Sequence, residues 1–221
     1  MADIRTTSLL DSFQRPNEDP LSGGGIWGEV GSTSPFNHQM RNFDHSATGF
    51  IQFASFLWWS RYIPLTISGD MQIWGQVTIR EGAFDAYEMG FFSGMGGDGT
   101  NLDGYLVEWT HNGGADRPIL YRMDNSVTTI LDTYNAPAFI NPDTLLLMQI
   151  VGDDIETYYS NDAGANWTLA NQATDTTYRS GLSLMLGTLG QNTNLVAWVG
   201  FGGGNPATDQ NIQLPYLGVG P

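Results

Sequence analysis

The stretch Met71-Gln72-Ile73-Trp74-Gly75-Gln76-Val77-Thr78-Ile79-Arg80 carries the clearest secondary-structure pattern of the chain. Its apolar and polar positions alternate, with one set formed by Met71, Ile73, Val77 and Ile79 and the other by Gln72, Trp74, Gln76, Thr78 and Arg80. Successive side chains of a β-strand point to opposite faces, so this alternation predicts a strand with one face on a core and the other on solvent or a ligand. Trp74 among hydrogen-bonding groups suits a sugar-binding sheet or a subunit interface, and burial under a loop is the alternative.

Similar runs of β-branched, aromatic and aliphatic residues, separated by Gly, Asn or Asp, recur on both sides of this stretch and predict further strands. They cover Phe50–Ser60, Tyr87–Ser93, Tyr105–His111, Pro118–Met123, Val127–Asp132, Leu145–Val151, Ile155–Ser160, Trp167–Gln172, Gly181–Gly187 and Leu195–Phe201. Helical patterns are nearly absent. Many short strands with turns between them predict an all-β protein, a two-sheet antiparallel β-sandwich.

The two ends of the chain differ from this middle part. We expect an N-terminal segment over residues 1–12, a sandwich over residues 13–203 and an extended C-terminal arm over residues 204–221. The arm carries the apolar side chains Leu214, Tyr216, Leu217 and Val219, which suit a purely solvated tail poorly. We expect both terminal segments to anchor the domain to neighbouring subunits, and a disordered tail is the alternative.

Composition excludes several classes of protein. The net charge of −15 and the isoelectric point near 4.1 would repel a phosphate backbone, so nucleic acid is not an expected partner. The chain has no cysteine and therefore no disulfide, thiolate nucleophile or zinc–sulfur site. Its first residues lack the basic start and apolar stretch of a signal peptide, and no segment has the apolar length of a membrane helix. We expect no membrane insertion.

The opening Asp11-Ser12-Phe13-Gln14-Arg15, with Leu21, Trp27 and the strand series that follows, resembles the laminin-G-like and concanavalin A-like jelly-roll modules of phage and bacterial surface proteins. The resemblance extends over roughly residues 8–203 and lies in strand order and turn placement. It implies a jelly roll of the concanavalin A-like type. Among such modules the chain is most similar to stand-alone virion proteins of tailed phages, which serve as capsid decoration, head fibre or minor tail proteins.

The sharpest local motif is an Asp box, Ser160-Asn161-Asp162-Ala163-Gly164-Ala165-Asn166-Trp167. In this pattern Asp162 accepts backbone hydrogen bonds, Gly164 supplies an unusual backbone angle, and Trp167 packs beneath the hairpin. The residues Ser160, Asp162, Gly164 and Trp167 therefore predict a structural turn. Ligand contact is the alternative.

Paired carboxylates are the feature that a glycan hydrolase would need. Jelly-roll glucanases place them at alternate positions of one strand, and here Glu81, Asp85 and Glu88 do not share a face while Glu108 stands alone on its strand. We expect no catalytic residue and no enzymatic activity. Glu108 joins Gln72, Trp74, Gln76 and Arg80 as a candidate face for a sugar or a protein partner.

The loop Gly96–Gly104 is rich in oxygen ligands and glycine, and Asp98, Asn101 and Asp103 could hold a calcium ion. A tight glycine turn is the alternative, because the loop lacks a complete ligand pattern. No cofactor is otherwise required.

These features together predict a non-enzymatic binding or structural module of a phage virion, assembled in the host cytoplasm and present in many copies. Its expected partners are capsid or tail subunits, with host-surface glycans as further ligands. A carbohydrate-binding, lectin-like module is the alternative, followed by a glycan hydrolase.

Overall fold

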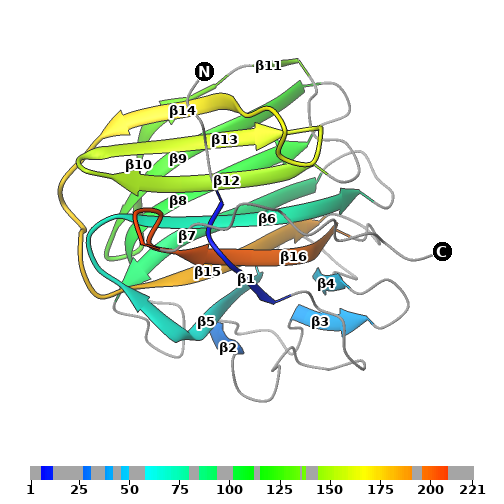
Figure 1. Cartoon of the computed structure of the whole chain (residues 1–221), viewed down its shortest axis with the longest axis horizontal. Helices are drawn as coiled ribbons and strands as arrows, with labels where there is room; N and C mark the ends of the chain where they lie inside the picture. The colour runs from blue at the N-terminus through cyan, green and yellow to red at the C-terminus, as the bar shows by residue number, and fades with distance from the viewer. Residues whose placement is uncertain are drawn as a thin grey trace.

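The computed structural model describes residues 6–11, 27–30, 38–41, 46–49, 58–79, 85–93, 102–111, 115–134, 136–137, 144–190 and 196–208. These residues form two β-sheets that pack face to face, and no helix occurs among them (Figure 1). Every strand pair in these ranges is antiparallel. The prediction of a two-sheet antiparallel β-sandwich is confirmed.

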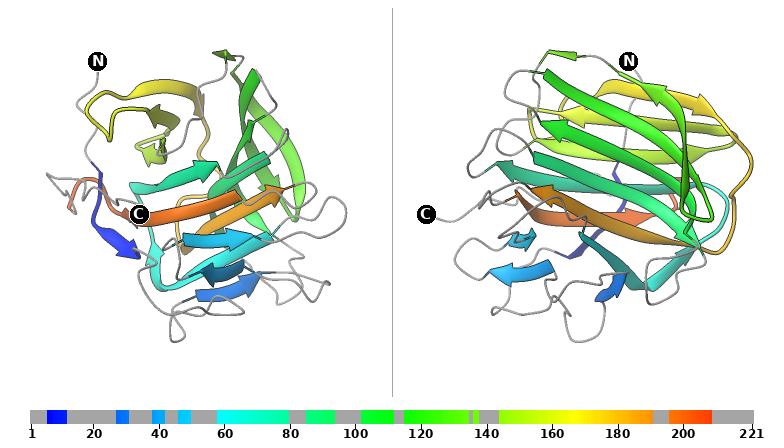
Figure 2. Two further views of the ribbon diagram at one scale, coloured as in Figure 1. Left: turned by 90° about the vertical axis from the view of Figure 1, so that its right-hand side faces the viewer. Right: turned by 180° about the vertical axis from the view of Figure 1, so that it is seen from behind.

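We call the sheet nearer the viewer in Figure 1 the front sheet and the other the rear sheet. The front sheet has the order β14 (Thr168–Thr174), β13 (Asp154–Ser160), β12 (Leu145–Val151), β6 (Met71–Ile79), β16 (Val196–Gly204), β4 (Ser46–Gly49) and β3 (His38–Arg41), with β1 (Leu9–Asp11) also pairing β16. The rear sheet has the order β10 (Val127–Thr133), β9 (Ala115–Asp124), β8 (Asp103–His111), β7 (Asp85–Ser93), β15 (Leu182–Gly190), β5 (Trp58–Ile67) and β2 (Trp27–Val30), with β11 (Ala136–Pro137) also pairing β9. Figure 2 shows the two layers from the side and from behind.

The main core lies between the sheets and is built from alternate residues of their strands. Strand β6 contributes Met71, Ile73 and Val77, as its alternation predicts, and all three are fully buried. Large aromatic side chains from the rear sheet, including Tyr87, Phe91, Tyr105 and Trp109, fill the same layer. A buried aromatic side chain removes about 150–250 Å² from water, which is worth a few kcal/mol at about 25 cal/mol per Å². This layer therefore supplies most of the driving force that holds the sheets together.

Each sheet also carries a smaller apolar cluster on its outer face. On the front sheet Trp74 packs with Leu145, Leu147, Tyr158 and Trp167. Trp74 pairs in register with Gly202 of β16, and a Cβ on Gly202 would collide with the indole ring. Glycine at position 202 therefore leaves the space in which the Trp74 ring lies.

On the rear sheet the outer cluster, which we call the rear apolar cluster, consists of Phe92, Leu102, Leu106, Met123 and Met185 with Tyr121 against it. These residues alternate with inward-facing core residues along β7, β8, β9 and β15. Part of each sheet is thus apolar on both of its faces. This accounts for the near-continuous apolar sequence of a central strand such as β12.

Most predicted strands lie within a few residues of the observed ones, and the differences fall in the N-terminal quarter. The strand expected over Phe50–Ser60 is observed as β5 at Trp58–Ile67, and residues 50–57 lie outside the described part of the chain. Residues 14–48 contain the short strands β2, β3 and most of β4, none of which is among the strands predicted from the sequence. These short strands extend the edges of both sheets, where pairing with a preformed strand compensates for weak local preference.

The N-terminal segment contributes to the sandwich itself, which corrects the expectation that residues 1–12 only serve neighbouring subunits. Leu9 pairs with Gly202 and Asp11 with Phe201 of β16, and the Gly203 amide donates to the Ser8 carbonyl at 3.3 Å. Figure 1 shows β1 crossing in front of the front sheet. Thr6 and Thr7 are buried. The outer limits of the domain, at residues 13 and 203, stay a prediction for the rest of the two ends.

The Asp box forms the turn between β13 and β14. Asp162 accepts hydrogen bonds from the Ser160 hydroxyl at 2.7 Å, the Asn166 amide at 2.8 Å and the Asn166 side chain at 2.6 Å. These bonds, led by the one from the Asn166 side chain, lower the pKa of Asp162. Gly164 has φ +85°, in the region that favours glycine, and Trp167 is buried. The four residues thus occupy the positions that a structural turn requires.

Replacing Asp162 with Ala should lower the free energy of unfolding by about 1 kcal/mol, the usual cost of losing a turn or cap acceptor at an exposed site. Urea denaturation followed by circular dichroism measures the change. Asp154→Asn, an exposed carboxylate on β13, is the control. Unchanged stability of the Asp162 variant together with lost ligand binding would show that the turn serves a ligand instead.

Candidate functional site

The face predicted from β6 is covered by the protein's own N-terminal segment. Trp74 and Gln72 are 0% exposed and Gln76 is 5% exposed. The Trp74 indole donates to the Thr7 carbonyl at 2.9 Å, and the Gln72 side-chain oxygen accepts from the Thr7 amide at 2.7 Å. The groups that would bind a sugar therefore bind Thr7, and this part of the predicted face is corrected to a buried contact within the domain.

A row of polar side chains continues from Gln72 across the outer face of the front sheet. Gln72 donates to Gln149 at 3.2 Å, Gln149 donates to Glu156 at 3.0 Å, and Gln172 donates to Glu156 at 3.3 Å. The Tyr158 hydroxyl also donates to Glu156, at 2.7 Å, and burial together with this carboxylate raises the Tyr158 pKa. The buried members Gln72 and Gln149 find partners within the row, and Gln172 at its end is exposed. The row ties four strands together.

Glu108 does not belong to that face. It lies on β8, in the rear sheet, on the outer face of the sandwich opposite to Gln72 and Trp74. Arg80 lies outside the residues that the structure describes. The five residues predicted as one face therefore do not form one site.

The structure instead brings Glu108 against a second carboxyl group, that of Glu88 on β7. The two residues stand directly opposite each other in the β7–β8 register, and their carboxyl groups hydrogen-bond. Glu88 is only 2% exposed, while Glu108 is half-buried. Glu108 was predicted to stand alone because the sequence reasoning compared positions within single strands, whereas strand pairing places Glu88 beside it.

Burial is the largest cause of the raised Glu108 pKa, and the hydrogen bond to Glu88 acts in the opposite direction. A hydrogen bond between two carboxyl groups requires a proton on one of them. The pair therefore favours a state with one shared proton and one negative charge.

Tyr121 on β9 completes this site. Its register partner is Leu106, so it lies on the same outer face as Glu108, against the rear apolar cluster. Burial, and then the charges of Glu108 and Glu88, raise the Tyr121 pKa to about 12. The phenol therefore stays a hydrogen-bond donor. Glu108 and Tyr121 are the partly exposed members of this site and can accept from, and donate to, a polar ligand, whereas Glu88 and the rear apolar cluster are buried beside them.

Sequence reasoning missed Glu88 and Tyr121 as members of this site. The sequence predicts the strands that hold them, and it also predicts that β7, β8 and β9 are neighbours in that order. It does not predict the register of β7 against β8, because the residues between Ser93 and Asp103 allow several alignments. Only the observed pairing places Glu88 opposite Glu108.

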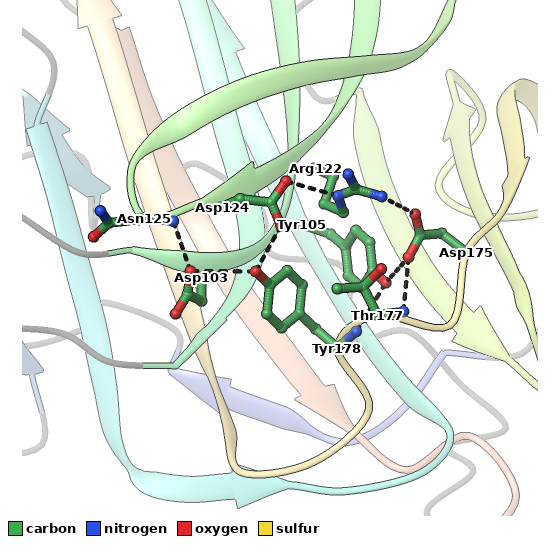
Figure 3. A network of polar contacts seen from close by, with 8 residues as sticks. All are labelled: Asp103, Tyr105, Arg122, Asp124, Asn125, Asp175, Thr177 and Tyr178. Atoms are coloured by element: carbon green, nitrogen blue, oxygen red, sulfur yellow. Dashed lines mark hydrogen bonds and ion pairs between the residues drawn. The ribbon is translucent and has the colours of Figure 1, made fainter.

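Asp103, predicted as a calcium ligand, belongs to a network at one end of the rear sheet (Figure 3). Its carboxylate accepts from the Asn125 amide at 2.7 Å and from the Tyr178 hydroxyl at 3.2 Å, and Tyr178 also donates to Asp124 at 2.7 Å. The hydrogen bond from Tyr178, followed by the one from Arg122, lowers the Asp124 pKa.

The same network reaches the connection between β14 and β15. Arg122 contacts Asp124 at 2.9 Å and Asp175 at 2.8 Å, and the Tyr105 hydroxyl donates to Asp175 at 2.6 Å (Figure 3). Burial opposes the ionisation of Asp175, but its hydrogen bonds from Tyr105, Thr177 and Arg122 outweigh burial and lower its pKa to about 2. The network therefore fixes the end of the β9–β10 hairpin to the segment that follows β14.

The described part of this network does not fit a calcium site. The carboxylates of Asp103, Asp124 and Asp175 accept from amide, hydroxyl and guanidinium donors, and no three potential ligands in the described ranges are grouped to hold a metal. The other proposed ligands, Asp98 and Asn101, lie outside the described residues, as do the arm residues Leu214, Tyr216, Leu217 and Val219.

A separate cavity of about 400 Å³ opens near β1, β5 and the end of β16. It is lined by Leu10, Leu65, Thr66, Ile67, Ser68, Gly203, Gly204, Asn205 and Thr208. This lining has neither a charged nor an aromatic side chain. This cavity therefore has fewer groups that could hydrogen-bond to a polar ligand or stack on it than the site around Glu108.

Comparison with known proteins supports the fold class. No protein-family model matches the sequence, and no curated protein sequence matches it. Among solved structures, the exoplasmic/lumenal domain of VIP36 in its Ca²⁺/Man3GlcNAc-bound form is similar over 92% of this chain and 90% of its own, with TM-score 0.65 and 10% identity. A legume lectin-like domain from Entamoeba histolytica is similar over 90% of this chain and 99% of its own, with TM-score 0.58 and 8% identity.

A third neighbour, the carbohydrate-binding module CBM66 from Bacillus subtilis, is similar over 78% of this chain and 91% of its own, with TM-score 0.50 and 16% identity. The chain therefore has a β-sandwich fold similar to that of these lectin-like domains, in agreement with the concanavalin A-like fold that the sequence resemblance implied. Identities this low establish the fold alone. The structure describes no helix with the length and apolarity needed to cross a membrane.

The acid pair makes a pH-dependent prediction. Because the folded-state pKa of Glu108 is raised, its contribution to stability is complete below the unfolded pKa of about 4.3 and is lost as pH rises through the folded value. The melting temperature should therefore fall as pH rises above about 4.3 in the wild type and less in Glu108→Gln, whose amide keeps a donor toward Glu88. Asp154→Asn removes the same charge elsewhere and should keep the fall.

Differential scanning calorimetry between about pH 4 and pH 8 measures both variants. Asp175 acts in the opposite sense and at more acid pH, since its lowered pKa makes its contribution disappear only as pH falls toward about 2. An identical pH profile for wild type and Glu108→Gln would contradict the shared-proton arrangement.

Proposed function

We propose that the protein is a non-catalytic glycan-binding module whose ligand lies on the outer face of the rear sheet. The observation that carries this proposal is the direct contact of Glu88 and Glu108 beside Tyr121 and the rear apolar cluster. Sugar hydroxyls donate to carboxylates and accept from a phenol, and the C–H face of a sugar ring can pack on the partly exposed ring of Tyr121. The lectin-like fold adds support, because the descriptions of its neighbours name bound mannose oligosaccharide or carbohydrate binding.

The geometry favours binding over hydrolysis. Retaining glycosidases hold their two carboxyl groups about 5–5.5 Å apart and inverting ones about 6.5–9.5 Å apart, to leave room for the sugar or a water. Carboxyl groups that hydrogen-bond each other are closer than either spacing. The pair in this protein is therefore arranged to accept hydroxyl groups and not to flank a glycosidic bond.

A glycan array followed by isothermal titration calorimetry on the strongest glycan tests the proposal. Glu108→Gln and Tyr121→Phe should each weaken binding about tenfold, which corresponds to about 1.4 kcal/mol, because the first replaces a carboxylate acceptor by an amide and the second removes a hydroxyl donor. Asp154→Asn on the front sheet should bind as the wild type does. Titrations in calcium and in chelator test whether a calcium ion assists binding.

Two results would overturn the proposal. If both variants bind like the wild type, the ligand lies elsewhere or does not exist. If the bound glycan is shortened during incubation and Glu88→Gln abolishes the cleavage, the protein is a hydrolase.

We further propose that the module serves in a phage virion, with capsid or tail subunits as partners and host-surface glycans as ligands. This narrower proposal rests on the sequence resemblance and on the apolar arm. It is compatible with glycan binding, since a multi-copy surface protein multiplies weak contacts. The arm is expected to add itself to a neighbouring subunit through its apolar strip.

Truncation after Thr208 tests the role of the arm. Strand β16 extends to Gly204, and Asn205–Thr208 form a turn in which the Thr208 amide donates to the Asn205 carbonyl at 3.1 Å, so a cut at 204 would damage the sheet. The chain ending at residue 208 should keep its cooperative melting, judged by circular dichroism, and fail to enter virus particles. Incorporation equal to that of the full chain would remove the support for the arm as an anchor.

A further inference from the structure

Strand β10 is the outermost strand of the rear sheet path, and its free side is open. It pairs with β9, and no other strand of the described residues pairs with it. All four residues Val127–Ile130 are exposed, with Val127 at 66% and Ile130 at 61%, the two most exposed large hydrophobic side chains in the described ranges. An open strand edge presents a row of backbone donors and acceptors to another strand.

The open edge lacks the features that usually prevent such pairing. The segment Val127-Thr128-Thr129-Ile130-Leu131 has no charge, no proline and no glycine in a chain of net charge −15, and four of its five residues are β-branched. The edge ends at Asp132, after a register shift in β10. There the Asp132 carboxylate accepts from the Gln172 amide at 3.0 Å and joins β10 to β14.

This edge is also held rigid. Asn125 and Ser126 form the hairpin turn with φ +51° and +64°, the Ser126 amide donates to the Leu102 carbonyl at 2.9 Å, and Asp103 fixes the Asn125 amide. Asp124, at the end of β9, is held by Tyr178 and Arg122 (Figure 3). A preorganised strand loses little conformational freedom when it pairs.

We infer that β10 pairs antiparallel with β10 of a second copy of this chain, so that the rear sheets of two molecules join into one. A pair centred on Thr129 uses the whole open edge. It places Val127 opposite Leu131 of the second copy and Thr128 opposite its Ile130. An isologous contact of this kind closes as a two-fold dimer and leaves no further edge of β10 free.

The lack of charge along the edge favours a second copy as the partner. Centring on Thr129 pairs the uncharged residues 127–131 with one another and leaves Asp132, which accepts from the Gln172 amide, outside the paired stretch. The uncharged edge is thus self-complementary within a strongly acidic molecule. This inference goes beyond glycan binding and does not depend on it.

Sedimentation velocity of the full chain over roughly 1–100 µM tests the inference. The wild type should associate to a dimer, more strongly at higher salt because screening reduces the repulsion of two molecules of charge −15. Thr129→Lys should remain monomeric with an unchanged melting temperature. Thr168→Lys, the same change at an exposed position on β14, the edge of the front sheet, should dimerise as the wild type does.

Disulfide trapping tests the register, since the chain has no cysteine of its own. Thr129→Cys should give a covalent dimer under mild oxidation, because paired residues on the axis lie within disulfide reach. Val127→Cys should not, because its symmetry mate is about four residues, or roughly 13 Å, away along the strands. A monomeric wild type, a dimer that survives Thr129→Lys, or equal cross-linking of both cysteine variants would overturn the inference.

Discussion

The structure depends on one constraint, that the two sheets share a single apolar layer. Met71, Ile73 and Val77 of β6 face this layer from the front sheet, and aromatic side chains such as Tyr87 and Trp109 face it from the rear sheet. Side chains alternate along a strand, so fixing the inner face also fixes what each strand presents outward. The two outer faces, and everything they can bind, follow from the packing of the inner ones.

The outer faces of the two sheets differ in what their polar side chains contact. On the front sheet, Thr7 uses its backbone to satisfy Gln72 and Trp74, so the N-terminal segment closes that face much as a ligand would. On the rear sheet, Glu108 and Tyr121 are only half-buried beside the rear apolar cluster. Buried polar groups need partners, and the front sheet finds them within the domain while the rear sheet leaves hydrogen-bonding capacity at its surface.

Polar networks then fix the ends of the sandwich. Tyr178 and Arg122 connect the β9–β10 hairpin to the segment after β14, and Asp132 connects β10 to β14 from the other end. Such links join the rear sheet to the last strand of the front sheet and to the segment that follows it. The fold is shared with lectin-like proteins at about a tenth sequence identity, as expected when alternation and core volume matter more than particular residues.

The sequence by itself determined the all-β class, the two faces of β6 and the turn at Asp162, because each is written in the alternation or spacing of neighbouring residues. It did not place Trp74 under Thr7 or Glu88 against Glu108. The first depends on a contact between residues 67 positions apart, and the second on the register of two strands whose connecting loop permits several alignments. Local patterns specify which way a side chain points, whereas what it meets there is decided by tertiary packing.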